Sequence, residues 1–257
     1  LILGLLAKGE TVVERPNPGA DCEATLACAQ ALGATVTRQP GTVVLVGRAG
    51  KLCEPDRVLD CGNSGTTIRL LAGVLAAQPF VAILAGDASL HLRPVARVIA
   101  PLRAMGAQLW ARDQDRLPPL AIRGGALRAI DHRVDVASAQ VASCVLLAGL
   151  FAEGRTTVSL PMPVRDHTQR MLEAFGIPVS CGSRTPAEGG GPSFSVTGPA
   201  VPAATRVRVP GDFSAAAFFL ATAAASPGAS VTARDVNLNP TRTGLLAVLE
   251  RMGAGVV

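Results

Sequence analysis

The stretch GLFAEGRTTVSL, residues Gly149–Leu160, joins an apolar segment to a β-branched run through a break at Gly154. The same order of apolar segment, glycine or proline break and β-branched run also begins at residues 4, 73 and 221. A second pattern recurs in step with it, a helical stretch closed by glycine and followed by a strand-like segment, at Gly33, Gly106, Gly176 and Gly253. Glycine in this position supplies the left-handed residue that closes a helix. Two patterns that share a period of about 70 residues indicate an internal repeat.

Each repeat is predicted to fold as helix, strand, helix and strand, with a further strand before the next copy. In the second copy, Ile68, Leu71, Ala72 and Leu75 follow the i, i+3, i+4, i+7 spacing of a helix face. Segments 141–151 and 215–224 are apolar on all sides, which predicts wholly buried helices. A period this long is larger than that of most solenoids. It favours a pseudo-symmetric α/β domain built from a few equivalent units.

The ends of the chain fall inside the repeat. The first copy starts at Leu1, already within its helix, and the last copy reaches Val257 just as a strand begins. We therefore expect an internal fragment of a longer protein. Residues 1–208 are expected to form most of one domain, with three repeat units of which the first is truncated. Residues 209–257 are expected to begin a second, truncated domain.

The charged residues favour small anions as ligands. The net charge is +5, and only Lys8 and Lys51 among the 24 basic residues are lysines. Arginine suits the two-pronged capture of phosphate or carboxylate. Basic residues form no run, and aromatic residues make up only 3% of the chain. Nucleic-acid binding is therefore disfavoured, because single-strand binders usually stack bases on aromatic side chains.

The cysteines and the apolar segments exclude further classes. The six cysteines lack the spacing of metal ligands, so we expect reduced, buried thiols and no metal site. The apolar run Ala215–Ala225 is much shorter than the roughly 18 residues of a membrane span. These features predict a cytoplasmic protein that is not inserted in a membrane.

Polar and small residues stand where the buried helices begin. The segment CGNSGTTIR (Cys61–Arg69) places Gly, Asn and hydroxyl residues at one helix start. Ser138–Gln140 and Gly211–Ser214 stand at equivalent places in later copies. Free N–H groups and the helix dipole make such a terminus an anion site, and pseudo-symmetry predicts that equivalent termini converge. The alternative is simple capping, which typically stabilises a helix by about 1 kcal/mol.

Two further segments carry candidate side chains. Arg93 precedes Pro94 at the expected start of a helix, where a rigidly held guanidinium could clamp an anion. Near residue 165, Asp166 and His167 suggest acid–base chemistry. We prefer the simpler interpretation, that Asp166 and Thr168 cap the helix that follows and that His167 is incidental.

Five segments resemble, in order and spacing, those of the 5-enolpyruvylshikimate-3-phosphate synthase family: LDCGNSGTTIRLLAGVL, GDASLHLRPVARVIAPLRAMGA, ASAQVASCVLLAGL, RDHTQRMLEAFG and VPGDFSAAAFFLATAAASPGASVTARDVNLNPTRTG. The resemblance covers essentially the whole chain. It implies two domains, each of three βαβαββ units, that face each other across a cleft. It also implies transfer of the enolpyruvyl group of phosphoenolpyruvate to the 5-hydroxyl of shikimate-3-phosphate, without metal or cofactor, in a monomeric enzyme.

The same resemblance implies roles for individual residues. For phosphoenolpyruvate it indicates Asn63, Gly65, Arg93 and Gln140. For shikimate-3-phosphate it indicates Ser138, Ala139, Gln140 and Arg165. The catalytic Lys, Asp and Glu of the family are expected outside this chain, so the fragment by itself is expected to be inactive. Gly65 is further expected to leave room for the herbicide glyphosate.

Two alternatives stay open at this point. One is the enolpyruvyl transferase that acts on UDP-N-acetylglucosamine, which shares fold and reaction but typically has a Cys in the loop ahead of its Arg-Pro motif. The corresponding stretch here, Gly86–Ser89, has none. The other is a non-catalytic anion-binding or RNA-binding module on a related fold, against which the dispersed arginines argue.

Overall fold

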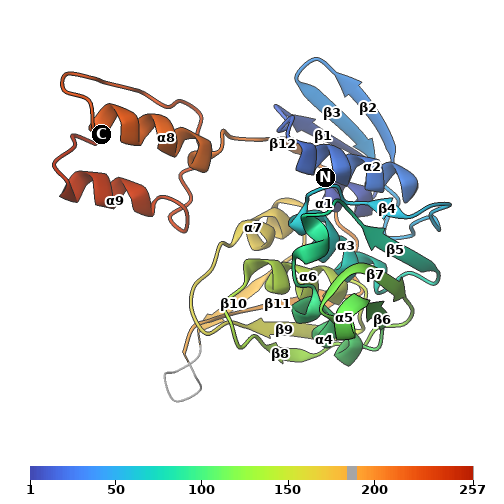
Figure 1. Ribbon diagram of the computed structural model, residues 1–257. Helices are drawn as coiled ribbons and strands as arrows, with labels where there is room; N and C mark the ends of the chain where they lie inside the picture. Colours follow the sequence, from blue (N-terminus) through green and yellow to red (C-terminus); the bar gives the residue numbers. More distant parts are fainter. Residues whose placement is uncertain (184–189, 257) are drawn as a thin grey trace. The chain divides into compact units, whose positions relative to one another are not determined.

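The computed structural model describes residues 1–183 and 190–256 (Figure 1). The chain divides into two compact units, Leu1–Val207 and Arg208–Val257. Val257, the last residue of the fourth glycine pattern, lies outside the described residues.

The larger unit contains the expected repeats. The first copy consists of α1 (Ile2–Leu6), β1 (Glu10–Glu14), α2 (Ala20–Ala31), β2 (Thr35–Gln39) and β3 (Thr42–Val46). The second consists of β4 (Leu59–Asp60), α3 (Gly65–Leu75), β5 (Val81–Ala85), α4 (Ala96–Met105), β6 (Gln108–Ala111) and β7 (Leu117–Arg123), with the short helices η1 (Leu90–Leu92) and α5 (Arg112–Asp115) inserted. The third consists of β8 (Asp131–Arg133), α6 (Ala139–Gly149), β9 (Gly154–Ser159), α7 (His167–Ala174), β10 (Ser180–Ser183) and β11 (Pro192–Gly198). The predicted α/β repeat is confirmed, with the order βαβαββ in the second and third copies.

Each repeat forms a four-stranded sheet of the same topology. The orders are β4-β5-β7-β6, β8-β9-β11-β10 and β12-β1-β3-β2. The first strand of the second and third sheets runs parallel to its neighbour, and the remaining pairs are antiparallel. In the first sheet this place is taken by β12 (Arg206–Arg208), which spans the boundary between the two units in the chain. The backbone N–H of Val12 donates to the Thr205 carbonyl at 3.0 Å beside it. The sequence did not reveal this strand, which closes the first repeat.

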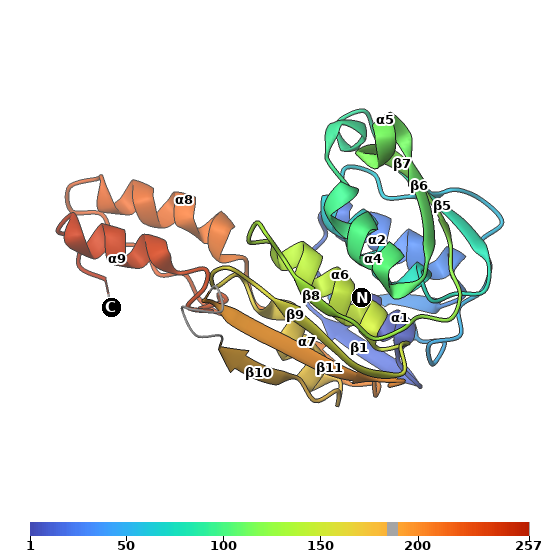
Figure 2. The same ribbon diagram turned by 90° about the horizontal axis from the view of Figure 1, so that it is seen from below.

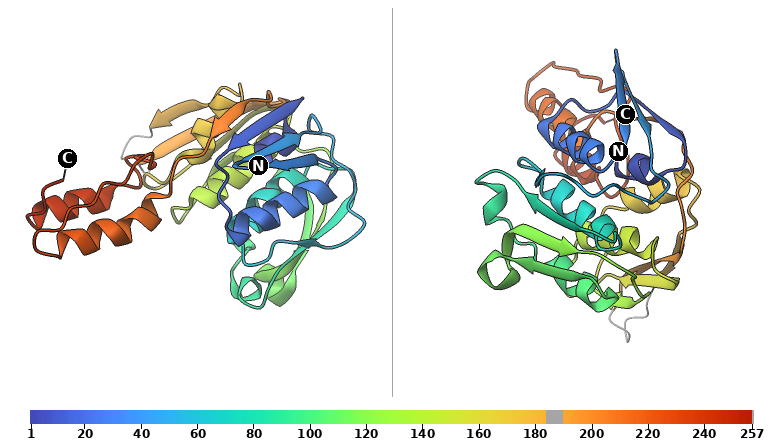
Figure 3. Two further views of the ribbon diagram at one scale, coloured as in Figure 1. Left: turned by 90° about the horizontal axis from the view of Figure 1, so that it is seen from above. Right: turned by 90° about the vertical axis from the view of Figure 1, so that its right-hand side faces the viewer.

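The first helix of each repeat forms the interior. Leu5 and Leu6 of α1, Ile68 of α3 and Val145 of α6 have no exposed surface. The second helices, α2, α4 and α7, bury one face only. Figures 2 and 3 show the helices of the larger unit packed against its sheets, with the strands of the first repeat in blue, those of the second in cyan to green and those of the third in yellow-green to orange. The burial predicted for 141–151 is confirmed for residues 141–150, which are all buried, whereas Phe151 is only partly buried.

Glycine shapes this interior in two ways. The four glycines predicted to close helices, Gly33, Gly106, Gly176 and Gly253, have φ values of 97°, 112°, 76° and 94°, which confirms their left-handed conformation. Gly73 of α3 instead permits close approach, because an added Cβ there would lie 2.3 Å from the Cys144 carbonyl oxygen of α6. The two central helices therefore pack backbone against backbone, which fixes how their N-terminal ends lie relative to each other.

The smaller unit consists of α8 (Phe213–Ala224) and α9 (Gly244–Arg251), which pack on each other. The burial predicted for 215–224 is wrong, since Phe218 and Phe219 are 77% and 70% exposed. Within α8, only Phe213 is buried. An apolar helix needs neighbours on every side to be buried, and in the described part of this unit α9 covers one side alone. Among the described residues, no helix combines the length and apolar character that a membrane crossing requires.

Candidate functional site

The N-terminus of α3 is built by the segment that follows β4. The Ser64 hydroxyl caps the helix by accepting a hydrogen bond from the Thr67 N–H at 3.1 Å. The segment is anchored on β5 through a 2.8 Å hydrogen bond from the Cys61 N–H to the Ala85 carbonyl. Gly65 is the first helical residue and is buried. The first N–H groups of a helix have no partner within the helix, so this capped turn directs donors outward.

Arg93 is hydrogen-bonded to the same segment. Its Nη1 donates to the Asn63 carbonyl at 3.1 Å, and its Nη2 donates to the Asn63 Oδ1 at 2.6 Å. The Asn63 amide in turn donates to Asp87 at 2.9 Å, and this hydrogen bond is the main cause that lowers the pKa of the Asp87 carboxyl. Arg93 thus orients the loop ahead of α3 and holds a positive charge beside it.

Arg69 connects three parts of the site, and sequence reasoning missed it. Its Nη1 donates to the Gly65 carbonyl and to the Gln140 Oε1, each at 3.0 Å. Its Nε and Nη2 both donate to the Pro94 carbonyl, at 3.2 and 2.7 Å. A signal was available, because residues four apart on a helix share a face and Arg69 follows Gly65 by four.

Gln140 joins the N-terminal ends of the two central helices. Besides accepting from Arg69, its Nε2 donates to the Thr66 Oγ1 at 3.0 Å. Ser138 caps α6 by accepting from the Val141 N–H at 3.3 Å, and Ala139 is the first helical residue. The first turns of α3 and α6 therefore lie side by side.

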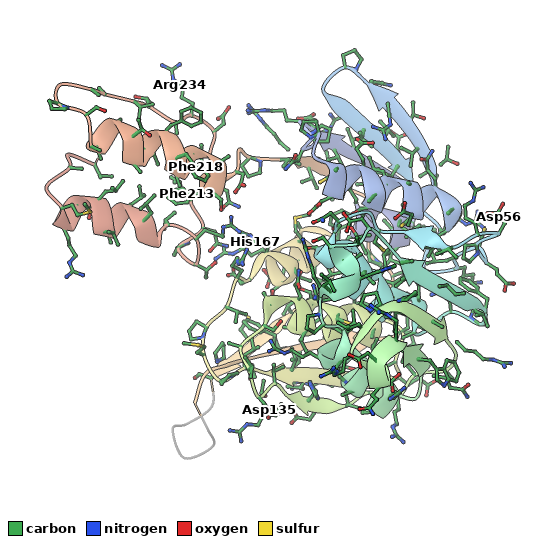
Figure 4. The ribbon with its side chains drawn as sticks, in the orientation of Figure 1. Asp56, Asp135, His167, Phe213, Phe218 and Arg234 are labelled. Carbon is green, nitrogen blue, oxygen red and sulfur yellow. The ribbon has the colours of Figure 1, made fainter. Side chains whose placement is uncertain are left out.

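The N-terminus of α7 lies beside the first turn and a half of α6. The Thr168 hydroxyl is hydrogen-bonded to the Ser143 hydroxyl at 2.6 Å. The predicted side-chain capping of α7 is wrong, because Asp166 holds the N-cap position without a capping bond and its carboxylate accepts from Arg170 at 2.9 Å. The hydroxyl of Thr168 is used by the neighbouring helix instead. Arg165 is exposed just ahead of this helix, and His167 is its first residue (Figure 4).

Gly65 has little space above it. A Cβ added there would lie 2.6 Å from the Arg69 Nη1 and 3.6 Å from the Arg93 Nη1. The guanidinium groups of Arg69 and Arg93 thus lie over Gly65, in the space that a side chain at this position would occupy.

Positive charge is concentrated at these helix ends. Burial, and then the nearby Arg93 and Arg97, lower the pKa of Arg69. Since arginine stays protonated in proteins, the mutual repulsion favours binding of an anion between the groups. The N-termini of α3 and α6 carry partial positive charge, which adds to the positive potential of these arginines. In the described part of the chain no three His, Cys, Asp or Glu side chains gather as a metal site.

The equivalent helix start in the smaller unit is also capped. Asp212 accepts a hydrogen bond from the Ser214 N–H at 2.9 Å, and Arg242 donates to Asp212 at 3.2 Å. Its convergence with the termini of α3 and α6 stays a prediction.

Known proteins match the chain along its whole length. The family model described as EPSP synthase (3-phosphoshikimate 1-carboxyvinyltransferase) matches residues 1–257. A 3-phosphoshikimate 1-carboxyvinyltransferase of Anaeromyxobacter dehalogenans is 54% identical over 256 residues, which are 100% of this chain and 56% of that protein. One of Geobacillus thermodenitrificans is 51% identical over 258 residues, covering 100% of this chain and 58% of that protein.

A solved structure agrees with these sequences. The EPSP synthase of Acinetobacter baumannii superposes with a TM-score of 0.86 at 42% identity, over 98% of this chain and 56% of that one. The chain thus spans a little over half the length of the relatives it matches. The α/β fold with three mixed sheets corresponds to that part of the known structure. On this agreement of sequence and fold, the chain belongs to the EPSP synthase (3-phosphoshikimate 1-carboxyvinyltransferase) family.

Proposed function

We propose that this chain forms the anion-binding part of a 3-phosphoshikimate 1-carboxyvinyltransferase. The enzyme transfers the enolpyruvyl group of phosphoenolpyruvate to the 5-hydroxyl of shikimate-3-phosphate and releases phosphate. It acts in the cytoplasm, in the synthesis of chorismate and aromatic amino acids. The observation that carries the proposal is the pair of capped helix starts, α3 and α6, joined under the guanidinium groups of Arg69 and Arg93.

Phosphoenolpyruvate is assigned to the start of α3. The N–H groups after Ser64 and the side chain of Arg93 supply donors and positive charge to its phosphate and carboxylate. Asn63 keeps Arg93 in place, and the missing side chain at Gly65 lets the Arg69 guanidinium lie directly over the first turn of the helix, where it adds positive charge. Gln140, which links the starts of α3 and α6, is assigned to contact with both substrates.

Shikimate-3-phosphate is assigned to the start of α6. Its phosphate would accept hydrogen bonds from the Ser138 hydroxyl and the first N–H groups of the helix, including that of Ala139. Arg165, exposed ahead of α7, would reach the same phosphate from the side. Thr168, three residues after Arg165, keeps the start of α7 against α6, and this contact supports the assignment of Arg165 to that phosphate.

The reaction needs these charges for a physical reason. The methylene carbon of phosphoenolpyruvate gains a proton, the sugar hydroxyl attacks the adjacent carbon, and phosphate then leaves. Two anionic substrates repel each other, and fixed donors and cations that already point at them offset this repulsion without reorganising. The residues that move protons are assigned to the part of the enzyme outside this chain.

Calorimetric titration of the 257-residue chain tests the proposal. It should bind phosphoenolpyruvate and shikimate-3-phosphate, and Arg165→Ala should weaken only the second. Binding of UDP-N-acetylglucosamine, or salt-dependent RNA binding without either anion, would contradict the assignment. With both substrates present, the chain alone should release no phosphate. Clear phosphate release would refute the placement of the proton-transfer residues elsewhere.

A further inference from the structure

The backbone that carries Arg93, residues 90–95, is anchored by apolar burial at its two ends. Leu90 in η1 and Val95 ahead of α4 are buried, with exposed fractions of 0% and 1%. Between these two anchors Leu92 is 74% exposed. Apolar burial therefore fixes the ends of this segment more firmly than its middle. The middle, from which the arginine extends, depends on polar contacts.

The turn that joins β6 to β7 is hydrogen-bonded to this segment at two places. The Arg112 Nη2 donates to the His91 carbonyl at 2.9 Å. The Val95 N–H donates to the Arg116 carbonyl at 2.8 Å. One of these bonds lies two residues before Arg93 and the other two residues after it. The β6–β7 turn therefore restrains the backbone on both sides of this arginine.

The β6–β7 turn has a strained backbone that its neighbours hold in place. Asp113, Gln114 and Asp115 have φ values of 58°, 54° and 66°, a left-handed conformation that residues with side chains disfavour. The Asp115 carboxylate accepts hydrogen bonds from the Ala111 N–H at 2.9 Å and from the Arg103 Nη2 at 2.7 Å. Strain of this kind persists only where the surroundings determine the backbone, and it is frequent near functional sites. The turn thus gives its side chains a fixed base.

The side chain of Arg112 connects this turn to η1. Besides its bond to the His91 carbonyl, its Nε donates to the Pro118 carbonyl of β7 at 3.2 Å. A planar guanidinium that binds two carbonyl groups at once has a defined direction, which the ammonium group of a lysine lacks. Arg112 therefore links the first residues of β7 to the peptide two residues ahead of Arg93.

We propose that Arg112 is a positioning residue for phosphoenolpyruvate binding and that it acts through Arg93. By holding the His91 carbonyl, Arg112 keeps the backbone in the place from which Arg93 makes its two bonds to Asn63. Without this bond, η1 is released at one end and the Arg93 guanidinium samples several directions. Binding of the anion must then order this side chain, which weakens affinity. The identity of the anion rests on the proposed function, whereas the restraint on Arg93 does not.

Arg116 in the same turn offers a matched control. It is exposed like Arg112, and its side chain forms an ion pair with Asp113 at 2.5 Å. Its bond to the Val95 N–H uses the backbone carbonyl, which an alanine retains. Replacement of either arginine by alanine removes one positive charge from the turn. A difference between the two variants therefore reports the bond to the His91 carbonyl and not the net charge.

Arginine side-chain NMR of the chain without ligand tests the restraint on Arg93. The Nε–H signal of Arg93 is assigned by its loss in Arg93→Lys, and its heteronuclear NOE reports how freely the guanidinium moves. We expect this NOE to fall in Arg112→Ala and to stay as in the unchanged chain in Arg116→Ala. An unchanged NOE in Arg112→Ala, or an equal fall in both variants, would overturn the inference.

Calorimetric titration tests the consequence for binding. Phosphoenolpyruvate affinity should fall about fivefold in Arg112→Ala and by less than about twofold in Arg116→Ala, with shikimate-3-phosphate affinity unchanged in both. In an Arg93→Lys background, Arg112→Ala should cause no further loss, because the group that it positions is gone. A further fivefold loss in that background, or an equal loss for both substrates, would contradict action through Arg93. If the unchanged chain binds no phosphoenolpyruvate, the proposed function fails, and the NMR comparison still decides whether Arg112 restrains Arg93.

Discussion

Replacement of Gly65 by alanine perturbs the site at its most crowded point. The added Cβ would lie 2.6 Å from the Arg69 Nη1, and ordinary contact between such atoms needs about 3.5 Å. Arg69 must therefore move by roughly 1 Å. Its Nη1 carries the hydrogen bonds to the Gly65 carbonyl and to Gln140, so this movement weakens or breaks the bonds by which Arg69 connects the starts of α3 and α6.

The expected loss of phosphoenolpyruvate affinity follows from these two hydrogen bonds of Arg69. A hydrogen bond to a charged group contributes about 1.5–3 kcal/mol, and Arg69 is half-buried, so loss of one of them should cost near the lower figure. Phosphoenolpyruvate affinity should then fall about tenfold. Fold stability should change little, because alanine favours a helix over glycine by about 1 kcal/mol and offsets part of the strain.

Calorimetry on the Gly65→Ala chain measures this, with Gly244→Ala as the matched control. Gly244 is likewise the first residue of a helix, α9, but an added Cβ there meets nothing within 4 Å. The effect should also be much smaller in an Arg69→Ala background, because the clashing group is gone. Unchanged affinity in Gly65→Ala, or an equal loss in both backgrounds, would refute the role given to Arg69.

Three further outcomes are expected. Arg93→Lys should weaken phosphoenolpyruvate binding about tenfold in calorimetry and leave urea unfolding unchanged, because an ammonium group cannot reproduce the two-pronged grip on the loop. Gly73→Ala should destabilise the fold by about 2 kcal/mol in urea, since its Cβ would meet the Cys144 carbonyl at 2.3 Å, whereas Gly125→Ala has open space and should be neutral. Burial lowers the pKa of His132 from 6.5, so the unfolded chain binds the extra proton first and stability should fall as pH drops below about 6.5. His132→Gln should flatten this fall in urea titrations between pH 7 and 5.

The repeat could be predicted from the sequence because each copy carries the same local patterns of apolar residues and glycines. Helix faces such as Ile68–Leu75 and helix-closing glycines such as Gly106 depend on neighbours within a few residues. The strand β12 escaped prediction because three residues carry almost no pattern, and its place beside β1 depends on a contact some 200 residues away in sequence. Phe218 shows where such a pattern fails. An apolar helix is predicted to be buried, but whether it is buried depends on other elements that cover it, and the pattern does not contain them.

Candidate residues of the site could be predicted from motifs, but the hydrogen bonds that connect these residues could not be predicted. Gly65, Arg93 and Gln140 stand in recognisable segments, whereas the role of Arg69 depends on three partners distant in the chain. Arg93 was expected to clamp an anion directly, and the structure adds its grip on Asn63. Side-chain geometry of this kind is determined by tertiary packing, which no local pattern encodes.

The shared site at the starts of α3 and α6 can be tested by titrating the isotope-labelled chain with phosphoenolpyruvate and following its NMR spectrum. The backbone signals of Gly65 and Thr66, and the side-chain signals of Arg69, Arg93 and Gln140, should shift together with one binding constant. Shifts confined to other parts of the chain, or none at these residues at saturating ligand, would contradict the account.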